Sequence, residues 1–306
     1  MKANGPQLEE ELRYGAQFTA RHLTTAPGAV PVIPDIDIYG RTIPLNGMVG
    51  GDLITYVNFQ ERFCLEARIQ EAAGRGQGEM VQALCRLGRS GGILVADVAG
   101  HEFVDAMRAL MLHQAFHTGA LYEMDLNGEI TVRLFEQINT RFLKSTTLRN
   151  LEADRDSSAF ITLIYGEIAS TGRFHFINAG HPLPLVFARE YDCFVDISPD
   201  RFISYPPIGL QPGEDHADAV RYERALGYKK RYTVNELNLM GRGDILLLYT
   251  DGLLDPFSEF TQRDLERVVS RVRGASARGI CEGVIARRLE AAGQSDDLSL
   301  VVIKRG

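Results

Sequence analysis

Four acidic sites in this sequence share one local pattern, because each lies next to an apolar segment and beside glycine or a second aspartate. Carboxylates that meet at one edge of a folded domain repel one another unless cations bind between them. Oxygen ligands without histidine or cysteine suit hard cations such as Mg²⁺ or Mn²⁺. The four sites are Asp52 in VGGD, Asp97 in VADVAGH, Asp251 in LYTDG, and Asp296 with Asp297 in QSDDLS.

Such a carboxylate set could hydrolyse a phosphoester. Two ions about 3.5–4 Å apart hold and deprotonate a bridging water. The resulting hydroxide attacks phosphorus in line, while the ions neutralise the charge that develops on the phosphoryl oxygens. No serine or cysteine nucleophile is then needed. A single Asp-Gly is most often a turn, so this prediction depends on all four sites meeting at one edge.

The surrounding pattern predicts elements that could bring the sites together. Gly74, Gly76 and Gly78 interrupt one of the predicted helices. Strands and helices do not alternate one for one, which favours an α+β sandwich over a doubly wound parallel sheet. Helices are expected over 7–23, 60–88, 102–118, 131–145, 261–272 and 276–292, and strands within 35–59 and over 93–96, 160–168, 173–178, 183–188, 245–249 and 298–303.

Composition limits the function classes. The 306 residues carry a net charge of −7, which disfavours a nucleic-acid or anionic-membrane binder. The start of the chain lacks the pattern of a signal peptide, and no apolar run is long enough for a transmembrane helix. We therefore expect a cytoplasmic protein whose thiols are reduced and mostly buried. The four cysteines are Cys64, Cys85, Cys193 and Cys281.

Seven segments together resemble the stage II sporulation E (SpoIIE) type of the metal-dependent protein phosphatases (PPM), the bacterial relatives of protein phosphatase 2C. The resemblance runs from Val32 to Lys304 and implies a four-layer α-β-β-α sandwich with two central antiparallel sheets. The segments are VGGD (49–52), ILVADVAGH (93–101), FITLIYGEI (160–168), FINAGHPLPLV (176–186), PIGL (207–210), GDILLLYTDGLLD (243–255) and SDDLSLVVI (295–303).

The resemblance implies two or three Mn²⁺ or Mg²⁺ ions and a serine/threonine phosphatase activity. By position, Asp97 should bridge two ions, with the Val98 carbonyl as a further ligand. Asp251 and Asp296 should complete the shell of the second ion. Asp52 should contribute directly or through water. The substrate implied is a phosphorylated regulatory protein such as an anti-sigma-factor antagonist.

Other residues are expected to support this site. Asp297 falls where eukaryotic relatives often have asparagine, and Gly51 lets the backbone approach closely. His101 could donate a proton to the leaving oxygen or fix its loop, and the second role is favoured. Arg41 is the nearest candidate for a phosphate-binding arginine. His113 and His117 have a metal-ligand spacing, but a half-buried helix face is the favoured interpretation.

Two departures from the family pattern keep an alternative open. Glu102 follows the Gly-His pair, and the helical insertion at about 60–88 is expected at or near the active face. The alternative is a catalytically weak phosphatase fold that binds a phosphoprotein or regulatory partner. A nucleotide cyclase, suggested by Gly-Gly-Asp, ranks low because Leu53 and Ile54 follow.

Residues 1–30 are expected to form a helix and lead-in that is a candidate for homodimerisation, and residues 31–306 are expected to form the phosphatase domain.

Overall fold

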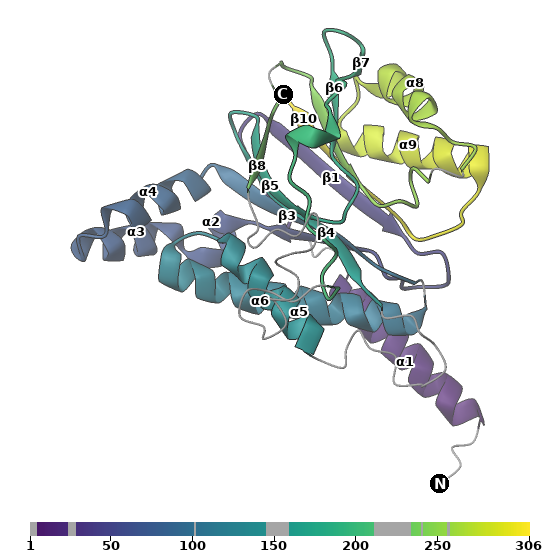
Figure 1. Cartoon of the computed structure of the whole chain (residues 1–306), viewed down its shortest axis with the longest axis horizontal. Helices are drawn as coiled ribbons and strands as arrows, with labels where there is room; N and C mark the ends of the chain where they lie inside the picture. The colour runs from purple at the N-terminus through teal and green to yellow at the C-terminus, as the bar shows by residue number, and fades with distance from the viewer. Residues whose placement is uncertain are drawn as a thin grey trace, which may run out of the picture.

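The computed structural model describes residues 5–23, 29–100, 102–144, 159–210, 234–239, 241–255 and 258–306. Two five-stranded sheets pack face to face, and helices cover both outer faces (Figure 1). Every strand pairing within the sheets is antiparallel. The predicted α+β class and the four-layer α-β-β-α sandwich are therefore confirmed.

The first sheet has the strand order β1-β10-β9-β6-β7. Its first and last strands in the sequence are neighbours, paired from Ile36↔Arg305 to Ile43↔Leu298. Residues near both ends of the domain therefore complete one sheet. The strands are β1 (Ile36–Ile43), β6 (Leu185–Ala188), β7 (Cys193–Phe194), β9 (Ile245–Tyr249) and β10 (Leu298–Arg305).

The second sheet has the order β2-β3-β4-β5-β8. Its central pairing places Asp97 opposite Thr162. Two short strands, β7 and β8, lie in the stretch 189–240 that the sequence pattern left unassigned. They could not be predicted, because two to four residues give too little alternation to detect. The strands of this sheet are β2 (Leu53–Val57), β3 (Ser90–Val98), β4 (Ile161–Ala169), β5 (Arg173–Ala179) and β8 (Asn235–Asn238).

The helices form the outer layers. The pair α8 and α9 packs on the first sheet, while α5 and α6 pack on the second (Figure 1). Helix α1 crosses beside α5, where Gly15 leaves room for the ring of Phe103. The helices are α1 (Gly5–Leu23), α2 (Phe59–Phe63), α3 (Leu65–Gly74), α4 (Gly78–Leu87), α5 (Phe103–Asn127), α6 (Val132–Lys144), α8 (Gln262–Val272) and α9 (Ala277–Ala292), with a short 3₁₀ turn at Pro199–Arg201.

Helix α5 is longer than predicted. It continues past residue 118 and ends at Gly128, whose φ of 71° is the left-handed conformation that closes many helices. Gly119 lies within this helix, and Leu134 of α6 packs where a side chain at that position would lie. Among the described residues, no helix combines the length and the apolar character that crossing a bilayer requires.

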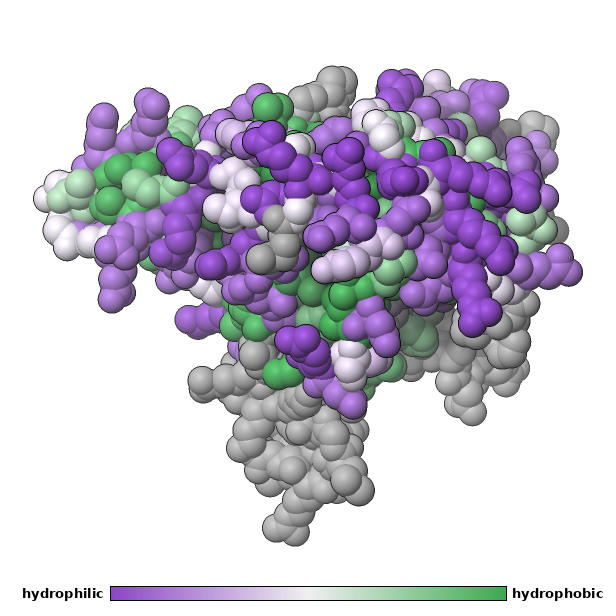
Figure 2. All heavy atoms as spheres, turned by 90° about the horizontal axis from the view of Figure 1, so that it is seen from above, coloured by the Kyte–Doolittle hydropathy of each residue, from purple (hydrophilic) through white to green (hydrophobic). Residues whose placement is uncertain are grey.

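The predicted helical insertion consists of α2, α3 and α4, but its expected place at or near the active face is wrong. It joins the end of β2 to the start of β3, while Asp52 precedes β2 and Asp97 lies near the end of β3. Because the two strands are antiparallel, the insertion leaves the sheet at the end opposite these carboxylates. Figure 2 shows the α3–α4 hairpin as a lobe that projects from the molecule.

The prediction that the thiols are mostly buried is also wrong. All four cysteines are free, as predicted, but Cys64 and Cys85 are exposed and only Cys281 is buried. The two exposed thiols belong to the insertion, which projects into solvent and has one face to bury. The prediction of mostly buried thiols followed from the average behaviour of cysteine and not from the local pattern.

Candidate functional site

Strand direction gathers the predicted carboxylates at one end of the sandwich. Asp52 immediately precedes β2, and Asp97 is the second-last residue of β3. In the other sheet, Asp251 lies two residues after β9, and Asp296 lies two residues before β10. Tyr249 at the end of β9 pairs with Leu300 near the start of β10. Each sheet thus contributes carboxylates from two neighbouring strand ends.

Side-chain alternation aims several of these groups into the space between the sheets. Ile54 of β2 and Val95 of β3 belong to the core between the sheets. Because every second residue of a strand faces the same side, Asp52 and Asp97 share that face. The same rule applies to Thr250, which lies two residues after Leu248 of the inter-sheet core. Thr250 therefore faces Asp52 and Asp97 from the opposite sheet. The site is therefore the open end of the inter-sheet core.

Hydrogen bonds tie the two sheets together here. The Thr250 hydroxyl donates to Asp52 Oδ2 at 2.8 Å and accepts from the Ser299 amide at 2.9 Å. Asp297 receives two backbone amides, Leu45 on Oδ1 at 2.7 Å and Gly51 on Oδ2 at 2.6 Å. With both oxygens occupied and 3% of the residue exposed, Asp297 is placed to hold the β1–β2 connection rather than to present its carboxylate.

Glycines let the loops at this end of the two sheets lie close together. A Cβ on Gly51 would lie 2.6 Å from the carbonyl oxygens of Val98 and Gly100, and one on Gly50 or Gly252 would collide with Asp297. Any larger residue would push the loops apart. The Val98 carbonyl, predicted as a ligand, therefore lies against Gly51.

The carboxylates affect one another electrostatically. Burial, and after it the negative charges of Asp251 and Asp296, raise the pKa of Asp97 to about 7. Burial and then Asp97 hold the pKa of Asp52 well above its usual range, despite the bond from Thr250. Burial and then Asp296 also raise the pKa of Asp251. The structure thus brings Asp52, Asp97, Asp251 and Asp296 within range of one another.

The chemistry of the donor set fits hard divalent cations. The converging groups are carboxylates, which such ions prefer, and their mutual repulsion is what a cation would offset. In the part of the chain that the structure describes, no three His, Cys, Asp or Glu side chains stand close enough to hold one ion as they are. The carboxylates therefore interact through their charges without forming a closed ligand cage.

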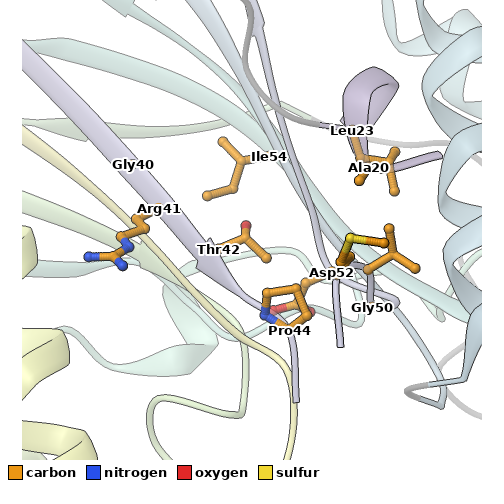
Figure 3. A pocket seen from close by; sticks show the side chains of 11 residues that line it. Ala20, Leu23, Gly40, Arg41, Thr42, Pro44, Gly50, Asp52 and Ile54 are labelled. Carbon is orange, nitrogen blue, oxygen red and sulfur yellow. The ribbon is translucent and has the colours of Figure 1, made fainter. Parts of the chain in front are cut away.

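Arg41 is not brought to the carboxylates. Thr42, its neighbour in β1, lines a cavity of about 250 Å³ together with Asp52 and with Ala20 and Leu23 of α1. Arg41 contributes to the wall, but its guanidinium points away from Asp52 (Figure 3). It faces the α9 side of the sheet, where its charge counteracts the raised pKa of Cys281.

The remaining predicted residues fall elsewhere. His101 lies outside the described residues. His113 and His117 are half-buried on α5, with their Nε2 atoms 3.1 Å apart, and Arg62 Nη1 lies 2.7 Å from His117 Nδ1. Burial lowers the pKa of His113 to about 4 and that of His117 to about 3. This environment agrees with the predicted half-buried helix face.

Sequence reasoning missed three polar residues that organise the site. Thr250 and Ser299 link Asp52 to the opposite sheet. Asp105, in the first turn of α5, adds to the negative charge around Asp97. The available signal for Asp105 was its position three residues after the start of a predicted helix, where a carboxylate accepts a backbone amide.

Comparison with known structures identifies the fold. The chain resembles the RsbU and RsbW domains of Rv1364c from Mycobacterium tuberculosis with a TM-score of 0.59 and 19% identity, over 92% of this chain and 64% of that one. It resembles the SiaA-PP2C domain of Pseudomonas aeruginosa with a TM-score of 0.59 and 15% identity, over 99% of both chains. At these identities the likeness shows the fold, which is that of the PP2C-type phosphatases.

A third structure and a sequence comparison give the family. The PP2C phosphatase domain of SpoIIE from Bacillus subtilis, with part of its regulatory domain, matches with a TM-score of 0.54 and 13% identity, over 88% of this chain and 62% of that one. The family described as Stage II sporulation protein E (SpoIIE) matches residues 88–306. The chain belongs to this family, which confirms the predicted resemblance and its class as a phosphatase. No curated protein matches it.

The family match begins at residue 88, but the fold begins earlier. Strand β1 pairs along its whole length with β10, and β2 pairs with β3. Residues before the match therefore complete both sheets and supply Asp52.

Proposed function

We propose that this protein is a metal-dependent serine/threonine phosphatase that acts on a phosphorylated regulatory protein. The observation that carries the proposal is the convergence of Asp52, Asp97, Asp251 and Asp296 from both sheets at the open end of one core, with the pKa of Asp97 raised to about 7 by burial and by its acidic neighbours. Membership of the SpoIIE family supports the same reaction.

In this proposal Asp97, Asp251 and Asp296 hold Mn²⁺ or Mg²⁺, with the Val98 carbonyl as a further ligand and Asp52 acting directly or through water. When bound, the ions activate a water for attack on phosphorus and offset the charge of the phosphoryl oxygens. Asp52 is kept in place by the Thr250 hydroxyl.

Two residues would hold the backbone around this centre. Asp297 fixes the β1–β2 connection through Leu45 and Gly51. Gly51 lets that connection lie against the Val98 carbonyl. Neither residue needs to touch the phosphate, which agrees with their predicted supporting roles.

The proposed partner is a phosphorylated anti-sigma-factor antagonist or a similar small regulatory protein in the cytoplasm. The family resemblance supports this class, and the negative net charge disfavours nucleic acid and anionic membranes. A homodimer built on α1 remains part of the proposal. It is tested by measuring the mass in solution before and after deletion of residues 1–30.

The deciding experiment is an assay with p-nitrophenyl phosphate and a phosphoserine peptide, in Mn²⁺, in Mg²⁺ and in EDTA. We expect turnover that requires metal and is lost in Asp97→Ala. The matched control is Asp264→Ala, which removes an aspartate at the start of α8. Retained turnover in Asp97→Ala would refute the ligand assignment.

The alternative is a phosphatase fold that binds a phosphoprotein with little turnover. The observation that favours it is Glu102, which follows the Gly-His pair where the family pattern has a glycine. Binding of the phosphoserine peptide without hydrolysis, in a folded protein supplied with Mn²⁺, would establish this alternative.

A further inference from the structure

Asp105 and Arg108 form a buried ion pair in the first turns of α5. Arg108 Nη1 lies 2.6 Å from Asp105 Oδ1, and the two side chains are only 11% and 8% exposed, respectively. The second oxygen of Asp105 accepts the amide of Glu102 at 3.0 Å. An ion pair removed from water stabilises a fold only when its geometry is good and its remaining hydrogen bonds are satisfied. Both oxygens of Asp105 meet that condition.

This carboxylate also supports the loop that follows Asp97. Gly100 has a φ of +113°, and a Cβ on it would collide with the carboxylate of Asp105. Gly100 therefore packs directly against the carboxylate of Asp105. A longer side chain at position 100 would be excluded twice, by the backbone conformation and by the aspartate.

The contact continues into the other half of the site. The Gly100 carbonyl lies against Gly51, where a Cβ would be 2.6 Å from its oxygen. Gly51 directly precedes Asp52, and its carbonyl accepts the amide of Val98 at 3.3 Å. A continuous stack thus runs from Asp105 through Gly100 to Gly51. It joins the loop that follows β3 to the loop that precedes β2.

We propose that the Arg108–Asp105 pair is a positioning device that sets the spacing of the Asp52 and Asp97 backbones, and through it the affinity of this edge for divalent cations. Arg108 fixes the rotamer of Asp105, and Asp105 supports Gly100. Neither side chain is a ligand. The cation part of this inference rests on the proposed function, whereas the spacing part concerns the protein alone.

The chain contains a matched control for this pair. At the start of α8, Asp264 accepts the amide of Thr261 at 3.1 Å and the guanidinium of Arg267 at 3.0 Å. The spacing and the bonding pattern are those of the α5 pair. The α8 pair is exposed, however, with the Arg267 side chain 70% and the Asp264 side chain 36% exposed. Substitutions there remove the same helix-capping bonds in a different helix layer.

The first test needs neither metal nor turnover. Amide hydrogen exchange is measured by mass spectrometry in EDTA for wild type, Asp105→Asn, Arg108→Met and Asp264→Asn. We expect at least fivefold faster exchange in peptides covering 50–53 and 97–100 for both α5 variants. Asp264→Asn should affect only peptides near 261–267. Unchanged exchange at 50–53 in both α5 variants would overturn the spacing role.

The second test measures Mn²⁺ binding by the electron paramagnetic resonance signal of the free ion, together with turnover at varied Mn²⁺. We expect Asp105→Asn and Arg108→Met to raise the Mn²⁺ concentration for half-saturation about tenfold. Arg108→Lys, which keeps the charge, should recover part of that loss. Asp264→Asn should leave it unchanged. Unaltered half-saturation in the α5 variants would refute the link to cation affinity.

The two tests separate this inference from the proposed function. If wild type neither binds Mn²⁺ nor hydrolyses phosphoesters, the proposed function fails and the affinity part of the inference fails with it. The exchange experiment still decides whether the pair sets the spacing of the two loops. A change in melting temperature without faster exchange at 50–53 would show that the pair only caps α5.

Discussion

Asp97 and Glu167 lie toward opposite ends of the same sheet, and the pKa of each is raised to about 7 with burial as the first cause. Asp97 pairs with Thr162 across β3 and β4, so Glu167 stands five residues further along, about 17 Å at the rise of a strand. One end holds the candidate site, whereas the other lies beside the insertion.

After burial, the neighbouring groups change the two pKa values in different directions. Every neighbour that affects Asp97 is another carboxylate and raises its pKa further. Glu167 accepts the Tyr165 hydroxyl at 2.8 Å, and Arg86 lowers its pKa while Glu129 raises it. A single proton neutralises an isolated acid such as Glu167. In a cluster of acids, a proton on one carboxylate still leaves charged neighbours whose repulsion a cation can offset, so the number of neighbouring carboxylates separates the candidate metal site from a buried acid.

The largest effect expected is on turnover. Asp97→Asn should lower hydrolysis by about 10²–10³-fold or more, because the variant removes a proposed cation ligand and its charge. Glu167→Gln should retain turnover within about twofold. Rates with p-nitrophenyl phosphate at saturating Mn²⁺ give the comparison. A loss of similar size in both variants would remove the distinction between the two ends.

Asp97→Asn should also stabilise the protein when metal is absent. The variant removes a carboxylate whose charged form is disfavoured by burial and by its neighbours, so unfolding in EDTA at pH 8 should cost about 1–3 kcal/mol more than for wild type. Urea denaturation measures this difference. A less stable variant in EDTA would show that the charge of Asp97 is compensated in the fold without a cation.

A second effect concerns Asp297, which belongs to the same cluster but serves the backbone. Asp297→Ala leaves the amides of Leu45 and Gly51 without acceptors, which should cost about 2–4 kcal/mol of folding stability. The loss should appear in EDTA as well as in Mn²⁺. Asp296→Asn is the control, since it should lower Mn²⁺ affinity without a loss of stability in EDTA, because its amide oxygen can still accept the Asp297 amide. If the Asp296 variant lost stability in EDTA and the Asp297 variant lost only Mn²⁺ affinity, the two assigned roles would have to be exchanged.

Much of this arrangement could be predicted from local pattern. Short continuous apolar runs in β3 and β9 predicted buried strands whose ends carry Asp97 and Asp251, and each run is contained in fewer than ten residues. Strand alternation also bears on Arg41, because Ile36 and Ile38 of β1 face the inter-sheet core and residue 41, with the opposite parity, faces the other side of the sheet. The insertion could also have been placed, because a segment between antiparallel neighbours leaves the sheet at the far end.

Other features depend on contacts that no local pattern contains. Thr250 and Asp52 are separated by 198 positions, and their bond exists only because the two sheets face each other at that end. The Asp105–Gly100–Gly51 stack likewise combines a helix cap, a positive φ and a neighbouring loop. Each of these residues has a common structural interpretation when considered alone, as a turn glycine or a helix cap. Their joint role needs three-dimensional packing.

Folding stability as a function of pH sharpens the comparison at the Glu167 end. The folded pKa is raised from 4.5 to about 7, so the folded state favours the protonated acid. This contribution is fully present below pH 4.5 and is lost as the pH rises through 7. Glu167→Gln should therefore be about 1–3 kcal/mol more stable than wild type at pH 8, with the difference vanishing near pH 4. Urea denaturation across this range would contradict the assignment if the two curves stayed parallel.

The smallest effect should come from the exposed pair Arg86–Glu129, whose atoms are 3.2 Å apart and whose side chains are 64% and 47% exposed. Solvent screens such a pair, so Arg86→Ala should change stability by about 0.5 kcal/mol or less and leave turnover unchanged. It should, however, raise the pKa of Glu167, because Arg86 is a charge that lowers it. The pH at which wild-type stability falls should then move upward in Arg86→Ala. An unchanged midpoint would mean that the charge of Arg86 has no part in the titration of Glu167, which would widen the contrast with the charge-coupled Asp97.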